Sequence, residues 1–160
     1  MNERFNADEI LEIAQQIERN GARFYRRAAE APLTPKLRRV LLDLAAMEEQ
    51  HEQTFARMQA DLSGKDWATT ALDRDGEAAL YLRAVAGGRV FGPDPSERLT
   101  GKEDIKDVFQ TAIGLEKDSI VFYLAIKQMV PEDLGRSKVE DIIREEMGHI
   151  VTLTGQFAGV

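Results

Sequence analysis

The strongest constraint on the fold is a motif that this 160-residue chain carries twice. Glu-x-x-His occurs at Glu48 and His51 and again, 98 positions later, at Glu146 and His149, and the chain has no other histidine. The same shift of 98 relates further pairs of residues: Glu18 and Glu116, Ala14 and Ala112, Asp43 and Asp141, and Phe24-Tyr25 and Phe122-Tyr123. Two copies of one helical hairpin, packed about a pseudo-twofold axis, would bring both copies of the motif to one shared site.

Apolar residues in four segments recur at spacings of three and four, which is the period of an amphipathic helix. We expect long helices near residues 7–30, 35–61, 101–130 and 133–156. Each expected start carries a capping signal: Asn6 with Glu9, Thr34 followed by Pro35, Thr100 with Glu103, and Ser137 with Glu140. The pattern therefore predicts an all-α chain.

About 40 residues, 62–100, separate the second and third expected helices. A short amphipathic helix is expected inside this segment at 76–86, and Trp67 is expected to anchor the segment by packing. A connection of this length is unusual in a compact domain, but it suits a chain that must cross the full length of a bundle. We therefore predict a single domain over residues 1–160, an all-α four-helix bundle of two hairpins joined by a long crossover, which is the ferritin-like connectivity.

Glutamate or histidine interrupts the apolar face of each expected helix. Residues three apart share one face of a helix, so Glu48 and His51 can present an oxygen and a nitrogen atom to one point. The repeated pair on the fourth helix can do the same. The interrupting residues, all expected in the core, are Glu18, Glu48, His51, Glu116, Glu146 and His149.

Four glutamates in one helical core require a counter-charge. An unpaired buried carboxylate costs several kcal/mol, or its pKa rises until it is neutral. Four carboxylates and two divalent cations together have no net charge, and glutamate can bridge two metals about 4 Å apart. The six residues therefore predict a dinuclear metal site suited to two-electron chemistry on O₂ or peroxide. The alternative is that Glu18 and Glu116 form core ion pairs with the histidines, although buried ion pairs rarely stabilise a bundle.

Tyr25 and Tyr123 each follow a core glutamate by seven positions. Both can pack in the core, and both can donate a hydrogen bond from the phenol to a ligand carboxylate. These two roles are compatible, so we treat the tyrosines as candidate catalytic-site residues that support the metal ligands.

Composition excludes several other functions. The net charge of −7 provides no basic surface for nucleic acid or an anionic membrane, and no apolar run is long enough to span a bilayer. The chain has no cysteine, which excludes disulfides, thiolate metal sites and iron–sulfur clusters. The polar N-terminal segment does not look like a secretion signal, so we expect a cytoplasmic protein.

The motifs resemble those of the rubrerythrin and ferritin-like superfamily. The motifs that carry the resemblance are Glu18-x5-Phe24-Tyr25, Glu48-x-x-His51, Glu116-x5-Phe122-Tyr123 and Glu146-x-x-His149. The resemblance implies a di-iron centre with Glu48 and Glu146 as bridging ligands. It also implies terminal ligands at Glu18 and Glu116 and one histidine on each metal.

Two departures from the rubrerythrin pattern affect the expected activity. This chain has no cysteine-bearing rubredoxin domain to act as an internal electron donor. Ser119 stands where rubrerythrins tend to carry an additional glutamate, so the expected ligand set is six and symmetric.

Rubrerythrin-like enzymes reduce hydrogen peroxide, whereas ferritins oxidise and store iron. We expect an oxidoreductase that reduces hydrogen peroxide or O₂ with electrons from an external donor protein. The alternatives are a ferroxidase or other iron-handling protein, and a non-enzymatic metal-binding module. We expect two iron ions, although manganese or zinc can occupy such ligands. A homodimer is also expected, because the crossover helix carries apolar residues beyond the needs of one strap: Ala79, Leu80, Leu82 and Val85. The alternative is that this helix packs entirely on its own bundle.

Overall fold

The computed structural model describes residues 7–62, 80–81 and 94–159. Four long helices account for most of this part of the chain: α1 (Ala7–Ala29), α2 (Pro35–Leu62), α4 (Ile105–Met129) and α5 (Arg136–Ala158). Two short 3-10 helices, η3 (Pro95–Arg98) and η4 (Glu132–Leu134), precede α4 and α5. The all-α prediction is confirmed, and the described ranges contain no strand.

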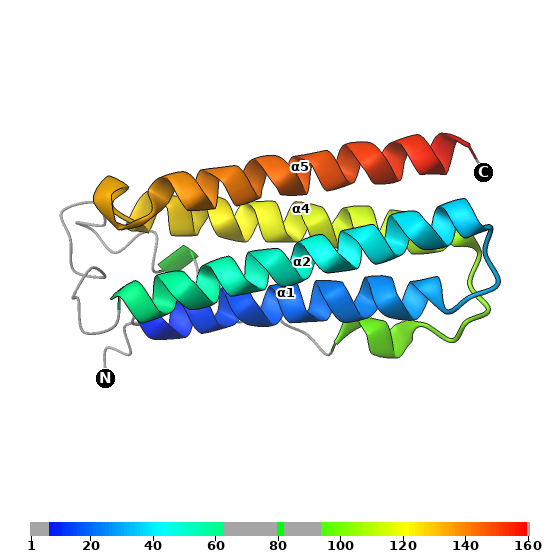
Figure 1. Ribbon diagram of the computed structural model, residues 1–160, viewed down its shortest axis with the longest axis horizontal. Helices are drawn as coiled ribbons and strands as arrows, with labels where there is room; N and C mark the ends of the chain where they lie inside the picture. Colours follow the sequence, from blue (N-terminus) through cyan, green and yellow to red (C-terminus); the bar gives the residue numbers. More distant parts are fainter. Residues whose placement is uncertain (1–6, 63–79, 82–93, 160) are drawn as a thin grey trace.

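The four long helices lie side by side along the long axis of the molecule (Figure 1). Helices α1 and α2 form one antiparallel hairpin, and α4 and α5 form the other. Helix α2 ends at the end of the bundle where α5 begins, whereas α4 begins at the opposite end (Figure 1). The connection between α2 and α4 therefore links opposite ends of the bundle, as predicted. An ion pair of 2.7 Å between Arg23 and Asp94 holds the last part of this connection against α1.

The predicted start of α2 is confirmed. Pro35 is its first residue, where a missing N–H has no consequence. The backbone N–H of Leu37 donates a hydrogen bond of 3.3 Å to Oγ1 of Thr34. Thr34 therefore caps α2.

The predicted start of α4 near residue 101 was wrong by four residues. Thr100 and Glu103 do form the expected hydrogen bond, from the Thr100 N–H to Oε1 of Glu103 at 2.5 Å. Gly101, however, has a φ of 83°, which no right-handed helix contains. The bond therefore closes a turn ahead of the helix, and Asp104 caps α4 by accepting from the N–H of Lys106.

The capping role predicted for Ser137 was also wrong. Helix α5 begins at Arg136, directly after Gly135, whose φ of 112° favours glycine and separates η4 from α5. Ser137 lies inside the first turn, and the helix begins three residues after the predicted start near residue 133.

Part of the predicted crossover lies outside the described residues. Of the short helix expected at 76–86, the structure describes Leu80 and Tyr81, and both are helical. Asn6 and Trp67 lie outside the described ranges. Leu80 is 63% exposed, and the homodimer stays a prediction.

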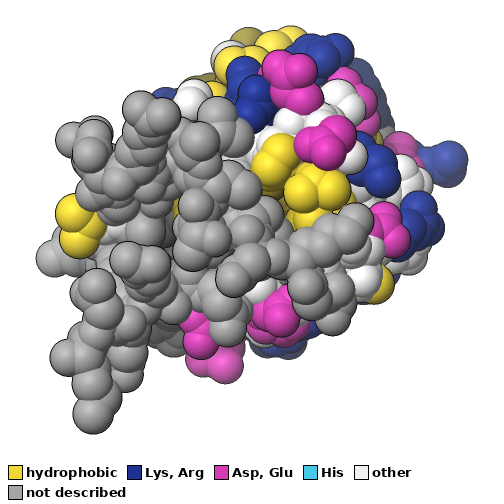
Figure 2. Space-filling model, turned by 90° about the vertical axis from the view of Figure 1, so that its left-hand side faces the viewer, with side chains coloured by type: hydrophobic (Ala, Val, Ile, Leu, Met, Phe, Trp, Pro, Cys, Tyr) yellow, Lys and Arg dark blue, Asp and Glu magenta, His cyan; other side chains and the backbone are white. Residues whose placement is uncertain are grey.

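The apolar core consists of two clusters with a polar layer between them. One cluster includes Phe55, Phe122 and Tyr123, and the other includes Tyr25 and Phe109. On the end of the bundle shown in Figure 2, acidic and basic side chains are interspersed over the described surface, and no described histidine is in view. No helix in the described ranges is both long and apolar enough to cross a membrane.

Candidate metal centre

The six side chains predicted as ligands form the polar layer between the two apolar clusters. They come from all four long helices, and none is more than 4% exposed. Helix α1 supplies one glutamate, α4 supplies one, and α2 and α5 each supply a glutamate and a histidine: Glu18, Glu116, Glu48 with His51, and Glu146 with His149.

The ligand atoms fall into two overlapping groups. Within each group, one atom from each residue lies within 4.8 Å of the others. Glu48 and Glu146 belong to both groups, which is the arrangement expected of two bridging carboxylates. The remaining members divide evenly: Glu18 and His51 in the first group, Glu116 and His149 in the second.

Each histidine faces the glutamate of the Glu-x-x-His motif in the other hairpin. Nδ1 of His51, on α2, lies 3.0 Å from Oε1 of Glu146, on α5. Nδ1 of His149 lies 3.0 Å from Oε1 of Glu48. The two imidazole rings are nearly parallel, with centroids 5.6 Å apart and an interplanar angle of 18°. The 98-residue repeat in the sequence therefore corresponds to a pseudo-twofold symmetry of the site in the structure.

Several polar atoms at the centre of this site lack hydrogen-bond partners. Among the described residues, the buried side-chain atoms without one are Oε2 of Glu18, Oε1 of Glu48, Oε2 of Glu146, and both ring nitrogens of His149. Some lie close together, as the 3.0 Å between His149 and Glu48 shows, but not in hydrogen-bonding orientations. Buried polar atoms are nearly always paired, so this concentration at one point fits atoms that face cations. The donor set of carboxylate oxygens and imidazole nitrogens fits a dinuclear site.

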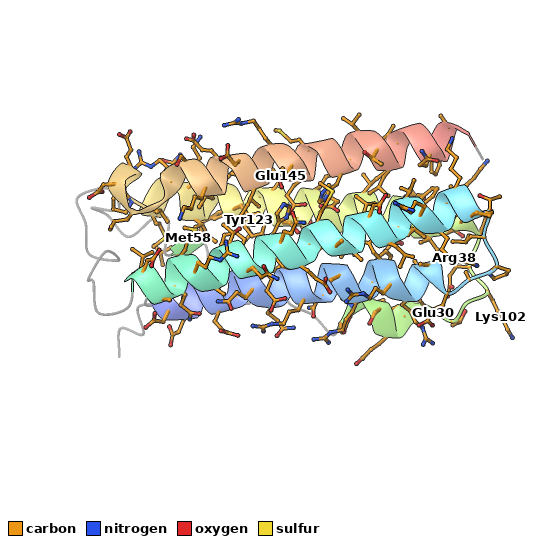
Figure 3. The ribbon with its side chains drawn as sticks, in the orientation of Figure 1. Glu30, Arg38, Met58, Lys102, Tyr123 and Glu145 are labelled. Atoms are coloured by element: carbon orange, nitrogen blue, oxygen red, sulfur yellow. The ribbon has the colours of Figure 1, made fainter. Side chains whose placement is uncertain are left out.

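Two buried tyrosines donate hydrogen bonds to Glu18 and Glu116 across the bundle. The hydroxyl of Tyr25, on α1, donates to Oε1 of Glu116, on α4. The hydroxyl of Tyr123, on α4, donates to Oε1 of Glu18, on α1. Tyr123 lies between the helices in Figure 3. Each tyrosine therefore donates its hydrogen bond to a glutamate of the other hairpin, and a role for the tyrosines at the metal site stays a prediction.

Burial and mutual repulsion control the protonation of the carboxylates. Burial, together with the charges of Glu48 and Glu146, raises the pKa of Glu18 well above its usual range. Burial, together with the neighbouring Glu146, raises the pKa of Glu116 to about 8. Without cations, Glu18 and Glu116 therefore tend to hold protons.

Burial lowers the pKa of a histidine, whereas it raises that of a carboxylate. Burial alone lowers the pKa of His51, but hydrogen bonds to Glu146 and Glu145 outweigh it and raise the pKa to about 9. The pKa of His149 rises to about 12, because the carboxylates of Glu116 and Glu146, which lie 3.3 and 3.1 Å from its Nδ1, outweigh the effect of burial. Metal ligands must be deprotonated, so cations would displace these protons.

Glu145 is a site residue that the sequence did not reveal. Its Oε2 lies 2.6 Å from Nε2 of His51, on the side of the ring away from the other ligands. Both residues line a cleft of about 320 Å³ whose other charged residues include Arg57, Lys138 and Asp141. Glu145 directly precedes Glu146, so an acidic residue beside the ligand was the available signal.

A family comparison identifies the chain. The family model for rubrerythrin matches residues 9–155, which include all six candidate ligands. The chain belongs to the rubrerythrin family. A crystal structure named as that of a ferritin-like diiron-carboxylate protein, from Thermotoga maritima, is similar to this rubrerythrin-family chain, with a TM-score of 0.74 and 28% sequence identity. The match covers 99% of this chain and 98% of that one, whereas no curated protein matches.

Ser119 marks where this rubrerythrin-family chain departs from the pattern with an additional glutamate. Ser119 is buried, and its hydroxyl donates a hydrogen bond of 3.0 Å to the backbone oxygen of Leu115. It lies one turn after Glu116 on α4. With serine here, the two described groups contain six candidate ligand residues, and their role as ligands stays a prediction.

Proposed function

We propose that this chain holds two iron ions and reduces hydrogen peroxide or O₂ with electrons from a separate donor protein. The observation that carries this proposal is the pair of overlapping ligand groups that share Glu48 and Glu146. Membership of the rubrerythrin family and similarity to a protein named as diiron-carboxylate support iron as the metal. Manganese and zinc suit the same ligand types and could replace it.

In this proposal Glu48 and Glu146 would help to hold both irons. Glu18 and His51 would complete one position, and Glu116 and His149 would complete the other. Four carboxylates balance two ferrous ions, which removes the electrostatic penalty of burying the glutamates. When bound, the iron pair supplies the two electrons that convert one peroxide and two protons into two waters.

The tyrosines keep the terminal carboxylates in place. Burial raises the pKa of Tyr25 and Tyr123 well above the usual range, so both phenols stay neutral and remain hydrogen-bond donors. Tyr123 binds Oε1 of Glu18, and Oε2 of the same carboxylate has no hydrogen-bond partner. One oxygen is therefore held by the protein and the other is available to a metal. Such supporting hydrogen bonds orient metal ligands and tune their strength.

The electron donor is proposed to be a different protein. An electron-transfer iron of the rubredoxin type requires cysteine ligands, and this chain has no cysteine. Sustained turnover should therefore require an added donor, whereas a single oxidation of the loaded site should not.

Stopped-flow mixing of the diferrous protein with hydrogen peroxide tests the proposal. We expect the irons to oxidise faster than free Fe²⁺ in the same buffer, with one peroxide consumed per two irons. Glu48→Ala, which removes a ligand common to both positions, should lose this rapid phase. Oxidation no faster than that of free Fe²⁺ would favour a non-enzymatic metal-binding module. Consumption of Fe²⁺ well beyond two per chain, with deposited product, would identify a ferroxidase.

A further inference from the structure

The two halves of the site differ at the outer nitrogen of each histidine. Nε2 of His51 lies 2.6 Å from Oε2 of Glu145, a residue of α5 whose side chain is 51% exposed (Figure 3). With Nδ1 of His51 facing Glu146 and Glu18, at 3.0 and 3.5 Å, the ring is held from both sides.

His149 has no equivalent support. Its Nε2 is buried and has no hydrogen-bond partner among the described residues. The 98-residue shift that takes His51 to His149 takes Met47 to Glu145, so methionine stands at the corresponding position on α2. A thioether sulfur is only a weak acceptor and carries no charge. The pseudo-twofold symmetry of the six candidate ligands therefore does not extend to the pair Met47 and Glu145.

This difference changes the two histidines as ligands. A carboxylate that accepts from the outer N–H of a metal-binding imidazole fixes its tautomer and orientation, and makes the inner nitrogen a stronger donor. Loss of such a partner typically lowers metal affinity about 10- to 100-fold. His51 has this partner and His149 does not.

We propose that Glu145 is a positioning residue that makes the two metal positions unequal. The position formed by Glu48, Glu146, Glu18 and His51 binds its ion more tightly and fills first. The position that contains His149 fills second. This inference rests on the metal pair of the proposed function, and it is independent of the reaction with peroxide.

Isothermal titration calorimetry with Fe²⁺ under anaerobic conditions measures both binding constants. The wild-type chain should bind two ions in distinguishable steps. Glu145→Gln keeps the shape of the side chain but removes its charge, and it should weaken the tighter step about tenfold or more while leaving the weaker step unchanged. Asp141→Asn is the matched control, because Asp141 lines the same cleft and forms an ion pair with Arg144. It removes the same charge and should change neither step.

The converse variant tests the symmetry directly. Met47→Glu places a carboxylate at the position related to Glu145, and Met47 is only partly buried. This variant should strengthen the weaker step about tenfold and bring the two constants together. A general disturbance of the fold would not strengthen binding.

Crystals grown with one equivalent of Fe²⁺ identify the position that fills first. Anomalous scattering should appear beside His51 in the wild-type protein. Scattering beside His149, or equal shifts of both constants in Glu145→Gln and Asp141→Asn, would overturn the inference while the metal pair stands. Absence of Fe²⁺ binding to the wild-type chain would instead overturn the proposed function itself.

Discussion

A Cβ atom on Gly21 would lie 2.8 Å from Oε2 of Glu48. Real Cβ contacts are essentially never this close, so a side chain at position 21 would displace the carboxylate. Helix α1 therefore approaches a proposed bridging ligand on α2 at a point where it has no side chain. The glycine permits the close approach that the site requires.

Gly21→Ala should separate metal binding from folding. The atom in the way is the end of a flexible side chain, so the fold should tolerate alanine while Glu48 moves out of its bridging position. We expect metal affinity to fall by about tenfold or more.

Gly114→Ala is the control, since a Cβ there meets nothing within 4 Å. That variant should be stabilised by up to about 1 kcal/mol through helix propensity and keep both metals. Metal titration and thermal unfolding of both variants provide the comparison, and full two-metal affinity in Gly21→Ala would contradict the role given to Glu48.

Tyr123→Phe should weaken the position that contains Glu18. The change removes the donor to Oε1 of Glu18, a carboxylate with 0% exposure, and leaves that atom unpaired. We expect the free energy of unfolding to fall by about 1–3 kcal/mol without metal. Affinity at one of the two positions should fall about tenfold. Tyr25→Phe should affect the other position, the one containing Glu116. Chemical denaturation and metal titration measure these effects, and equal effects of both variants on both positions would contradict the assignment.

Stability without metal should fall as the pH rises. The pKa of Glu116 is raised from 4.5 to about 8 and that of His51 from 6.5 to about 9, so the folded chain holds protons that the unfolded chain releases. Their contribution to the free energy of unfolding is present below the unfolded pKa and is lost as the pH rises through the folded pKa. The pKa of Glu146 is lowered, so its contribution to the free energy of unfolding has the opposite pH dependence. That contribution is present above the unfolded pKa and is lost as the pH falls through the folded pKa.

Metal binding should reverse this pH dependence. Because the ligands bind metals in their deprotonated forms, the rise in Tm caused by excess Mn²⁺ should grow between about pH 6 and about pH 9. Thermal unfolding with and without Mn²⁺ across this range measures the difference. A Tm increase that stays constant or shrinks with pH would show that these protons are not displaced by metal.

The sequence was sufficient to predict how the site is assembled. Glutamate in an apolar helical face is energetically unfavourable without a partner, so Glu18 and Glu116 could be assigned to the core without a structure. The repeat then required one shared site, and the structure brings all six residues together. That these residues bind metal stays a prediction. The connection between α2 and α4 was predictable from its length, because no short turn could use so many residues.

Other features depend on geometry that a one-dimensional pattern does not contain. The contact between Glu145 and His51 depends on how α5 is rotated against α2, so the sequence shows only that an acidic residue stands beside Glu146 and not which residue it contacts. The start of α4 depends on the positive φ of Gly101, although the sequence contained the correct hydrogen-bonding pair. Phe157 follows the helical period but is 37% exposed, because it lies beyond Leu153, the last buried residue of α5.

Anomalous diffraction from iron-loaded crystals is the most direct test of the metal pair. Two peaks should appear about 4 Å apart, with carboxylate oxygens of Glu48 and of Glu146 contacting both. Each peak should also contact one histidine, His51 or His149. A single peak, or two peaks that share neither glutamate, would contradict the dinuclear site on which this account depends.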